Sequence, residues 1–189
     1  MADWSEATAL IVVDVQKGFD DAVYWGLRNN PSCEQNIGVL ISEWRKQGWP
    51  VVYVRHDSAE PASPLRRGEP GNAFKDVLTG TPDLVVTKSA HSAFYGEPDL
   101  DSWLKGNGIS SVAICGIQTN ICCDSTARMA SDLGYDTLFV ADATHTFDLR
   151  GADGTILRAR ELARATALMF AAEFGTTLYT SELVEASAE

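Results

Sequence analysis

The chain has 189 residues, of which 45% are hydrophobic and 22% charged, a balance typical of one soluble globular domain, here residues 1–189. A formal net charge of -11 argues against nucleic acid as a partner, because phosphate binding relies on Lys and Arg. No apolar run approaches the roughly 20 residues that span a bilayer, the first residues lack the basic start of a secretory signal, and the four cysteines do not resemble a disulfide framework. We therefore expect a cytoplasmic protein with no membrane partner.

Six short segments rich in β-branched and apolar residues predict buried strands. In chain order they are 9–13, 50–54, 84–87, 111–115, 137–140 and 176–179. Helical patterns separate them, at 33–47, 99–105, 121–133 and 155–174. Because strand and helix alternate, the predicted class is α/β: a three-layer, Rossmann-like fold with a mostly parallel six-stranded sheet and helices on both faces.

The predicted helices differ in how clearly their ends are marked. Residues 33–47 have an apolar face, and Gly48 follows as a stop. The helix at 121–133 ends before Gly134, and the one at 155–174 ends before Gly175. The apolar positions of the last helix are Leu162, Leu168, Met169 and Phe174.

Residues 57–82 interrupt the alternation with four prolines and several glycines. We interpret them as a long surface loop with one helical turn at 73–78. Loops of this length within a compact domain are often lids or binding elements. The acidic residues after Ser181 predict a frayed end.

Three reactive residues stand at or just beyond the predicted strand ends, where sites form in doubly wound sheets. Asp14 ends the first strand, Lys88 ends the third, and Cys122 follows the fourth. Thr119 or Asn120 can cap the next helix, which leaves Cys122 in its first turn. There the helix end and a nearby ammonium would lower the thiol pKa, and a carboxylate could carry its proton.

Each of the three residues also has an ordinary interpretation. A cysteine on a helix is usually packing, a strand-terminal Asp is often a turn residue, and a Lys at a strand end is usually solvated. Taken singly they do not define a site, and their convergence depends on the topology of the sheet.

The local sequences around these residues are more specific. They are residues 10–19 (LIVVDVQKGF), 85–94 (VVTKSAHSAF) and 116–122 (GIQTNIC), followed by 125–128 (STAR) and 141–144 (ADAT). In this order and spacing they resemble the isochorismatase-like hydrolase family, which includes nicotinamidases and related cysteine amidohydrolases. The resemblance implies that Cys122 is the nucleophile, Asp14 the general acid and base, and Lys88 the group that activates the thiol.

The resemblance has further implications for the nucleophile loop. It implies a non-proline cis peptide between Ile117 and Gln118, and an oxyanion hole formed by the backbone N–H groups of Gln118 and Cys122. It also selects Cys122 over Cys123, which lies about 100° away on a helix and is expected to pack.

Two departures from the family narrow the expected chemistry. Many nicotinamidases hold a metal with an Asp and two His near the second strand. Here that region reads Val54-Arg55-His56-Asp57-Ser58 and no second His follows in the loop, so we predict no metal and no cofactor. His56 is then either a hydrogen-bonding residue at the edge of the crevice or an ordinary loop residue. Isochorismatases proper typically lack the nucleophilic Cys, so Cys122 favours an amidase.

The predicted substrate pocket rests mainly on the same resemblance. It contains Gln16 and Phe19 after the first strand, His56, and the aromatic residues Trp25 and Tyr95, whereas Phe94 is expected to pack in the core. The predicted function is cleavage of a small non-peptide amide or lactam through a thioester at Cys122.

Two alternatives keep the same fold. One is vinyl-ether hydrolysis of an isochorismate-like acid, with Asp14 as the acid. The other is a catalytically silent binding module. A dinucleotide enzyme is disfavoured because no Gly-x-Gly-x-x-Gly follows the first strand. The family resemblance also implies a homodimer or homotetramer.

Overall fold

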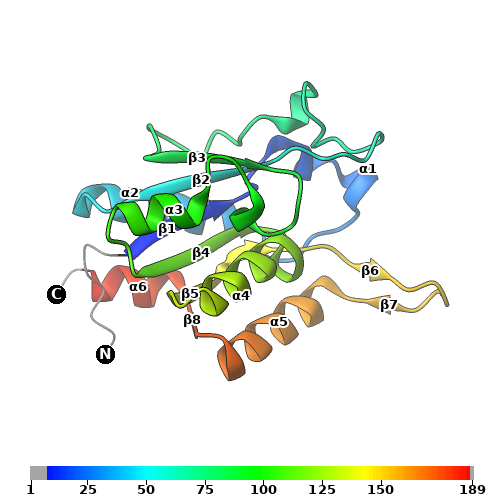
Figure 1. Ribbon diagram of the computed structural model, residues 1–189. Coiled ribbons are helices and arrows are strands. Elements are labelled where there is room, and N and C mark those ends of the chain that lie inside the picture. Colours follow the sequence, from blue (N-terminus) through cyan, green and yellow to red (C-terminus); the bar gives the residue numbers. More distant parts are fainter. Residues whose placement is uncertain (1–7, 188–189) are drawn as a thin grey trace.

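The computed structural model describes residues 8–187 and contains a six-stranded parallel sheet with helices on both faces (Figure 1). The strands are β1 (Thr8–Val13), β2 (Val51–His56), β3 (Leu84–Lys88), β4 (Ser111–Ile117), β5 (Asp136–His145) and β8 (Thr176–Leu178). Their order across the sheet is β3-β2-β1-β4-β5-β8. The predicted α/β class, strand number and parallel pairing are therefore confirmed.

The central strands are buried on both faces, as continuous apolar runs predict. Every residue of β1 and β4 is buried. One face of the sheet packs against α2 (Cys33–Gln47) and α6 (Thr180–Ala186) through side chains that include Trp44 and Leu183. The other face packs against α3 (Leu100–Gly106), α4 (Asp124–Asp132) and α5 (Ala159–Glu173), with Leu104, Ala127 and Phe170 among the buried contacts. Two apolar layers thus enclose the sheet.

The helix predicted at 33–47 has these bounds in the structure, and its stop is a glycine in the left-handed conformation. Gly48 has φ +72 and its N–H donates to the carbonyls of Arg45 and Trp44. The buried face of α2 is the predicted one, with Ile37, Leu40, Ile41 and Trp44.

None of the helices between residues 8 and 187 combines the length and the apolar composition that a membrane span requires.

The remaining elements are short. They are η1 (Lys17–Asp20), α1 (Ala22–Trp25), η2 (Pro70–Asn72), η3 (Ala93–Tyr95), η4 (Thr119–Cys123), β6 (Leu149–Arg150) and β7 (Ile156–Leu157). β6 and β7 pair antiparallel and form a hairpin that projects from the body next to α5 (Figure 1).

Four local predictions are wrong. Residues 155–158 do not begin a helix, because 156–157 pair with β6, and Leu168 and Met169 of α5 are exposed while Thr166 and Phe170 are buried. The segment after Ser181 is not frayed in the described part, since Thr180 begins α6 and Leu183 anchors it to the core.

The fourth wrong prediction is the helical turn at 73–78. Phe74 forms an antiparallel bridge with Gln16, and the Lys75 N–H donates to the Val15 carbonyl. These backbone bonds hold the 57–82 loop against the segment after β1. Pairing with a distant segment, which local propensity does not report, therefore decides the conformation of 73–78.

Candidate active site

Four adjacent strands bring their carboxyl ends to one edge of the sheet, and each end contributes to a single cluster. In spatial order, β3 ends at Lys88, β2 ends at His56, Asp14 follows β1, and the loop after β4 leads to Cys122. His56 and Lys88 are direct partners in the parallel register of β2 and β3. The sheet order therefore places His56 between Lys88 and Asp14.

The backbone around the cluster depends on two unusual positions. Asp14 has φ +52, in the left-handed region that Asp tolerates better than most side chains. Gly116 has φ +126, and a Cβ there would lie 2.0 Å from the Val13 carbonyl oxygen. A glycine at 116 thus lets β4 approach β1 closely just before the nucleophile loop.

The structure brings Asp14, Lys88 and Cys122 together. Lys88 Nζ lies 2.7 Å from Asp14 Oδ2 and 3.4 Å from Cys122 Sγ. The side chains of Lys88 and Asp14 are fully buried, and Cys122 is 7% exposed. Among the described residues no donor reaches Asp14 Oδ1. This leaves one carboxylate oxygen beside the thiol without a partner.

The pKa of the Cys122 thiol differs from the expectation drawn from the sequence. Burial raises this pKa far above its ordinary value, the charge of Asp14 raises it further, and Lys88 only partly opposes them. The expected lowering by the helix end and Lys88 is therefore wrong for the resting site. Cys122 rests as a thiol, and forming the thiolate requires a base.

The ammonium of Lys88 remains charged. Burial by itself lowers the pKa of Lys88, but Asp14 and then Cys122 raise it, and the net pKa is above the ordinary value. The site therefore holds one fixed positive charge, which can stabilise negative charge on either the carboxylate or the sulfur.

The nucleophile loop starts with a cis peptide bond between Ile117 and Gln118 and continues as one π-helical turn, η4. Cys122 lies in this turn, directly before α4. Isolated π-helical turns are frequent at functional sites. Cys123 is fully buried in the core, as expected for packing.

Neither residue that the sequence suggested as a helix cap serves as one. The Thr119 hydroxyl donates to Thr144 Oγ1, and Asn120 Oδ1 accepts from the Thr146 hydroxyl. Both partners lie at or just after the end of β5, so tertiary contacts replace the local cap. Thr146, which no sequence motif marked, thereby supports the nucleophile loop.

The predicted pocket residues have different environments. Phe19 is almost fully buried and stacks with Phe147, and the partly buried Trp25 packs against both rings. Tyr95 is 71% exposed and belongs to the outer surface of this chain. Gln16 is fully buried, and its amide hydrogen bonds to the backbone of His56 and Asn72. Gln16 therefore holds the backbone next to the site, and its buried side chain does not line an open pocket.

Comparison with known proteins agrees with this architecture and cluster. The sequence-family model described as the isochorismatase domain matches residues 8–172 of the chain. The chain belongs to the isochorismatase family.

Relatives of this isochorismatase-family hydrolase cover most of its length. An uncharacterized isochorismatase family protein of Bacillus subtilis, YrdC, is 38% identical over 95% of both chains. The ureidoacrylate amidohydrolase RutB of Methylorubrum extorquens is 31% identical, over 75% of this chain and 71% of its own. A crystal structure of an isochorismatase-family hydrolase from Chromobacterium violaceum superimposes with a TM-score of 0.90 at 32% identity, over 98% of this chain and 95% of that one.

The cluster of this hydrolase does not fit a metal ion in its present arrangement. A carboxylate oxygen of Asp14, a ring nitrogen of His56 and Sγ of Cys122 lie within 4.8 Å of one another. The position among them is taken by Lys88 Nζ, which is 3.3 Å from His56 Nδ1. A divalent cation there would meet the buried ammonium at close range, and like charges repel strongly in such a site.

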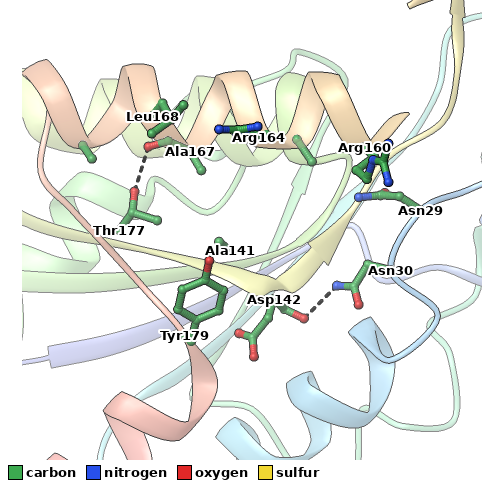
Figure 2. Close-up of a pocket in the computed structure, with 12 residues that line it drawn as sticks. Asn29, Asn30, Ala141, Asp142, Arg160, Arg164, Ala167, Leu168, Thr177 and Tyr179 are labelled. Carbon is green, nitrogen blue, oxygen red and sulfur yellow. Dashed lines mark hydrogen bonds between the residues drawn. The ribbon is translucent and has the colours of Figure 1, made fainter. Parts of the chain in front are cut away.

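An open cavity of this hydrolase lies elsewhere, between α5 and the strands β5 and β8 (Figure 2). It has a volume of about 520 Å³ and contains Asp142, Arg160, Arg164 and Leu168 among its lining residues. It shares no residue with the cluster at Cys122.

Proposed function

We propose that this chain is a cofactor-independent cysteine hydrolase that cleaves the C–N bond of a small non-peptide amide or lactam. The observation that carries the proposal is the buried contact of one ammonium, Lys88, with a carboxylate and a thiol. Amide-cleaving relatives support the class of bond: a nicotinamidase of Arabidopsis thaliana is 29% identical over about four-fifths of both chains, and RutB is named for an amide substrate.

The first half of the reaction forms a thioester. The Asp14 carboxylate takes the proton of the Cys122 thiol, and the sulfur attacks the carbonyl carbon of the amide. Backbone N–H groups of Gln118 and Cys122 donate to the resulting oxyanion. When the C–N bond breaks, Asp14 returns the proton to the leaving nitrogen.

The second half consumes one water. Asp14 takes a proton from the water, whose oxygen attacks the thioester carbon. The C–S bond then breaks, the sulfur leaves as a thiolate that regains the proton from Asp14, and the product acid departs. Lys88 remains protonated and stabilises whichever of Asp14 and Cys122 carries the negative charge.

The test is mass-spectrometric trapping of an acyl adduct during turnover of an amide panel. We expect an adduct on Cys122 in the wild type, and none in Cys122→Ala, with turnover lowered at least about 10³-fold. Cys123→Ala is the matched control, and it should keep both the adduct and most of the turnover. Amide cleavage that survives in Cys122→Ala would contradict the proposal.

Cleavage through a tetrahedral intermediate on Cys122 distinguishes the proposed reaction from vinyl-ether hydrolysis, which needs Asp14 but not the thiol. Activity on isochorismate in Cys122→Ala would favour that alternative.

The chain is also proposed to act in the cytoplasm as a homodimer or homotetramer. The molar mass in solution, measured by light scattering, tests the assembly.

A further inference from the structure

The ammonium of Lys88 has three N–H donors, and three acceptors surround it. They are Asp14 Oδ2 at 2.7 Å, His56 Nδ1 at 3.3 Å and Cys122 Sγ at 3.4 Å. The Lys88 side chain is fully buried, so water does not supply a substitute acceptor. His56 therefore completes the coordination of the catalytic ammonium.

The contact fixes the chemical form of His56. An ammonium only donates, so His56 Nδ1 must accept, which requires a neutral ring with its proton on Nε2. Burial and the positive charge of Lys88 both lower the pKa of His56, and His91 lowers it further. Asp14 and Asp57 oppose the shift without reversing it. His56 is thus neutral at neutral pH.

The backbone of His56 is held by two buried side chains. Gln16 Oε1 accepts from the His56 N–H at 2.8 Å, and Gln16 Nε2 donates to the His56 carbonyl at 3.0 Å. Asn72 Nδ2 donates to the same carbonyl at 3.1 Å. Gln16 follows β1 and Asn72 ends η2, so two other segments of the chain hold the backbone that carries the His56 ring.

We propose that His56 is a positioning residue that keeps the Lys88 ammonium between Asp14 and Cys122. The inference rests on the proposed function, in which negative charge moves from the Asp14 carboxylate to the Cys122 sulfur and back. The shorter contact of Lys88 is the one with Asp14. Without the acceptor at His56 Nδ1, the ammonium settles on the carboxylate and stabilises the thiolate less.

Alkylation of Cys122 by iodoacetamide tests this without any knowledge of the substrate. The rate is measured by mass spectrometry from pH 6 to 10 in the wild type, His56→Ala and His56→Asn. Asn Oδ1 can accept a hydrogen bond near the position of Nδ1 but cannot titrate. We expect the rate at pH 7.5 to fall about tenfold in His56→Ala, which corresponds to a thiol pKa about one unit higher, and to stay within about twofold of wild type in His56→Asn.

His91→Ala is the matched control, because His91 is exposed and makes no hydrogen bond to Lys88 in the described structure. It should leave the profile unchanged. A second readout is the ¹⁵N shift of the His56 ring, which should report the neutral Nε2–H form from pH 6.5 to 8. If His56→Ala misfolds, the Asn variant and the ring shift still decide the matter.

Three results would overturn the inference: a wild-type alkylation profile in His56→Ala, a His56→Asn variant that folds and is about tenfold slow, or an Nδ1–H ring. Failure of the proposed function has a different signature. It is amide turnover in Cys122→Ala, and no alkylation result with the His56 variants produces it.

Discussion

The cluster at Cys122 and the cavity beside α5 differ in almost every physical property. The cluster is small and closed, and its ammonium has an acceptor for each of its donors. The cavity is open and has a volume of about 520 Å³, four alanines and Leu168 line it together with polar and charged side chains, and its arginines, Arg160 and Arg164, are exposed (Figure 2). Within residues 8–187, neither Arg160 nor Arg164 takes part in an ion pair.

The difference shows that the volume of a cavity did not lead to the group that we propose as the nucleophile. Shifted pKa values cluster at functional sites, and burial beside a fixed charge is one way in which such shifts arise. Burial raises the pKa of Cys122 and Asp14 adds to it, while Lys88 stays charged. Arg160 and Arg164 of the cavity are exposed.

The largest expected effect comes from removing the charge at the centre of the cluster. Lys88→Met leaves the Asp14 carboxylate buried without its cation, which should lower the free energy of unfolding by about 3–5 kcal/mol and reduce turnover at least about 10²-fold. Urea denaturation and the amide assay measure the two effects. The matched control is Lys105→Met, because Lys105 is exposed and pairs with Asp101 on the surface, where about 0.5 kcal/mol is expected. Equal losses in the two variants would remove the contrast between buried and exposed charge.

The second effect concerns the close approach of β1 and β4. In Gly116→Ala the new Cβ would lie 2.0 Å from the Val13 carbonyl oxygen, so the strands must separate and Asp14 shifts relative to the nucleophile loop. We expect at least about 2 kcal/mol of destabilisation together with lost turnover. Gly134→Ala separates the two causes, since Gly134 also has positive φ but nothing lies within 4 Å of its Cβ position. If Gly116→Ala lost no more stability and turnover than Gly134→Ala, the approach of β4 to β1 at Gly116 would not be tight.

The central strands and the cluster at their ends show which features could be predicted from the sequence and which could not. The apolar runs of β1 and β4 predicted the strands, and the residues at their ends predicted where a site would lie. The thiol pKa could not be predicted, because it depends on the tertiary burial of Cys122 and on its contacts with Asp14 and Lys88. The contact of His56 with Lys88 depends on β2 lying between β3 and β1, and this order is not visible in a linear pattern.

The wrong predictions have the same origin. The acidic residues of α6 suggested a frayed end, but Leu183 is buried in the core and Thr180 donates to Asp142 at the start of the helix. Leu168 and Met169 have helical spacing yet face outward, because the buried stripe of α5 is made of Ala159, Thr166 and Phe170. Local composition reports whether a helix forms more reliably than it reports which side of it the sheet covers.

A third region extends the comparison, because it is charged and partly buried but shares no residue with the cluster at Cys122. Glu34 accepts hydrogen bonds from Arg28 and Lys75, and although burial opposes it, these cations lower the pKa of Glu34 from 4.5 to about 2. A carboxylate with a lowered folded pKa stabilises the protein above its unfolded pKa, and the stabilisation is lost as the pH falls from about 4.5 toward 2. We expect up to about 3 kcal/mol from this group.

Chemical denaturation at pH 7 and pH 3 of wild type and Glu34→Gln measures this contribution. The variant should be less stable at pH 7 and should lose less stability on acidification. Glu69→Gln, whose partner Arg66 is exposed, is the control and should follow the wild type. Parallel pH curves for Glu34→Gln and wild type would mean that the Arg28 and Lys75 contacts do not stabilise the fold.

The smallest effect is expected at the cavity beside α5. Arg164→Ala and Leu168→Ser each alter its wall, and both residues are exposed, so the free energy of unfolding should change by no more than about 0.5 kcal/mol. Turnover and Cys122 alkylation should stay within about twofold of wild type, because the cavity shares no residue with the cluster. A tenfold loss of alkylation rate in either variant would contradict the separation of the two regions. It would mean that α5, which packs on the sheet through Phe170, transmits a change at the cavity to the nucleophile loop.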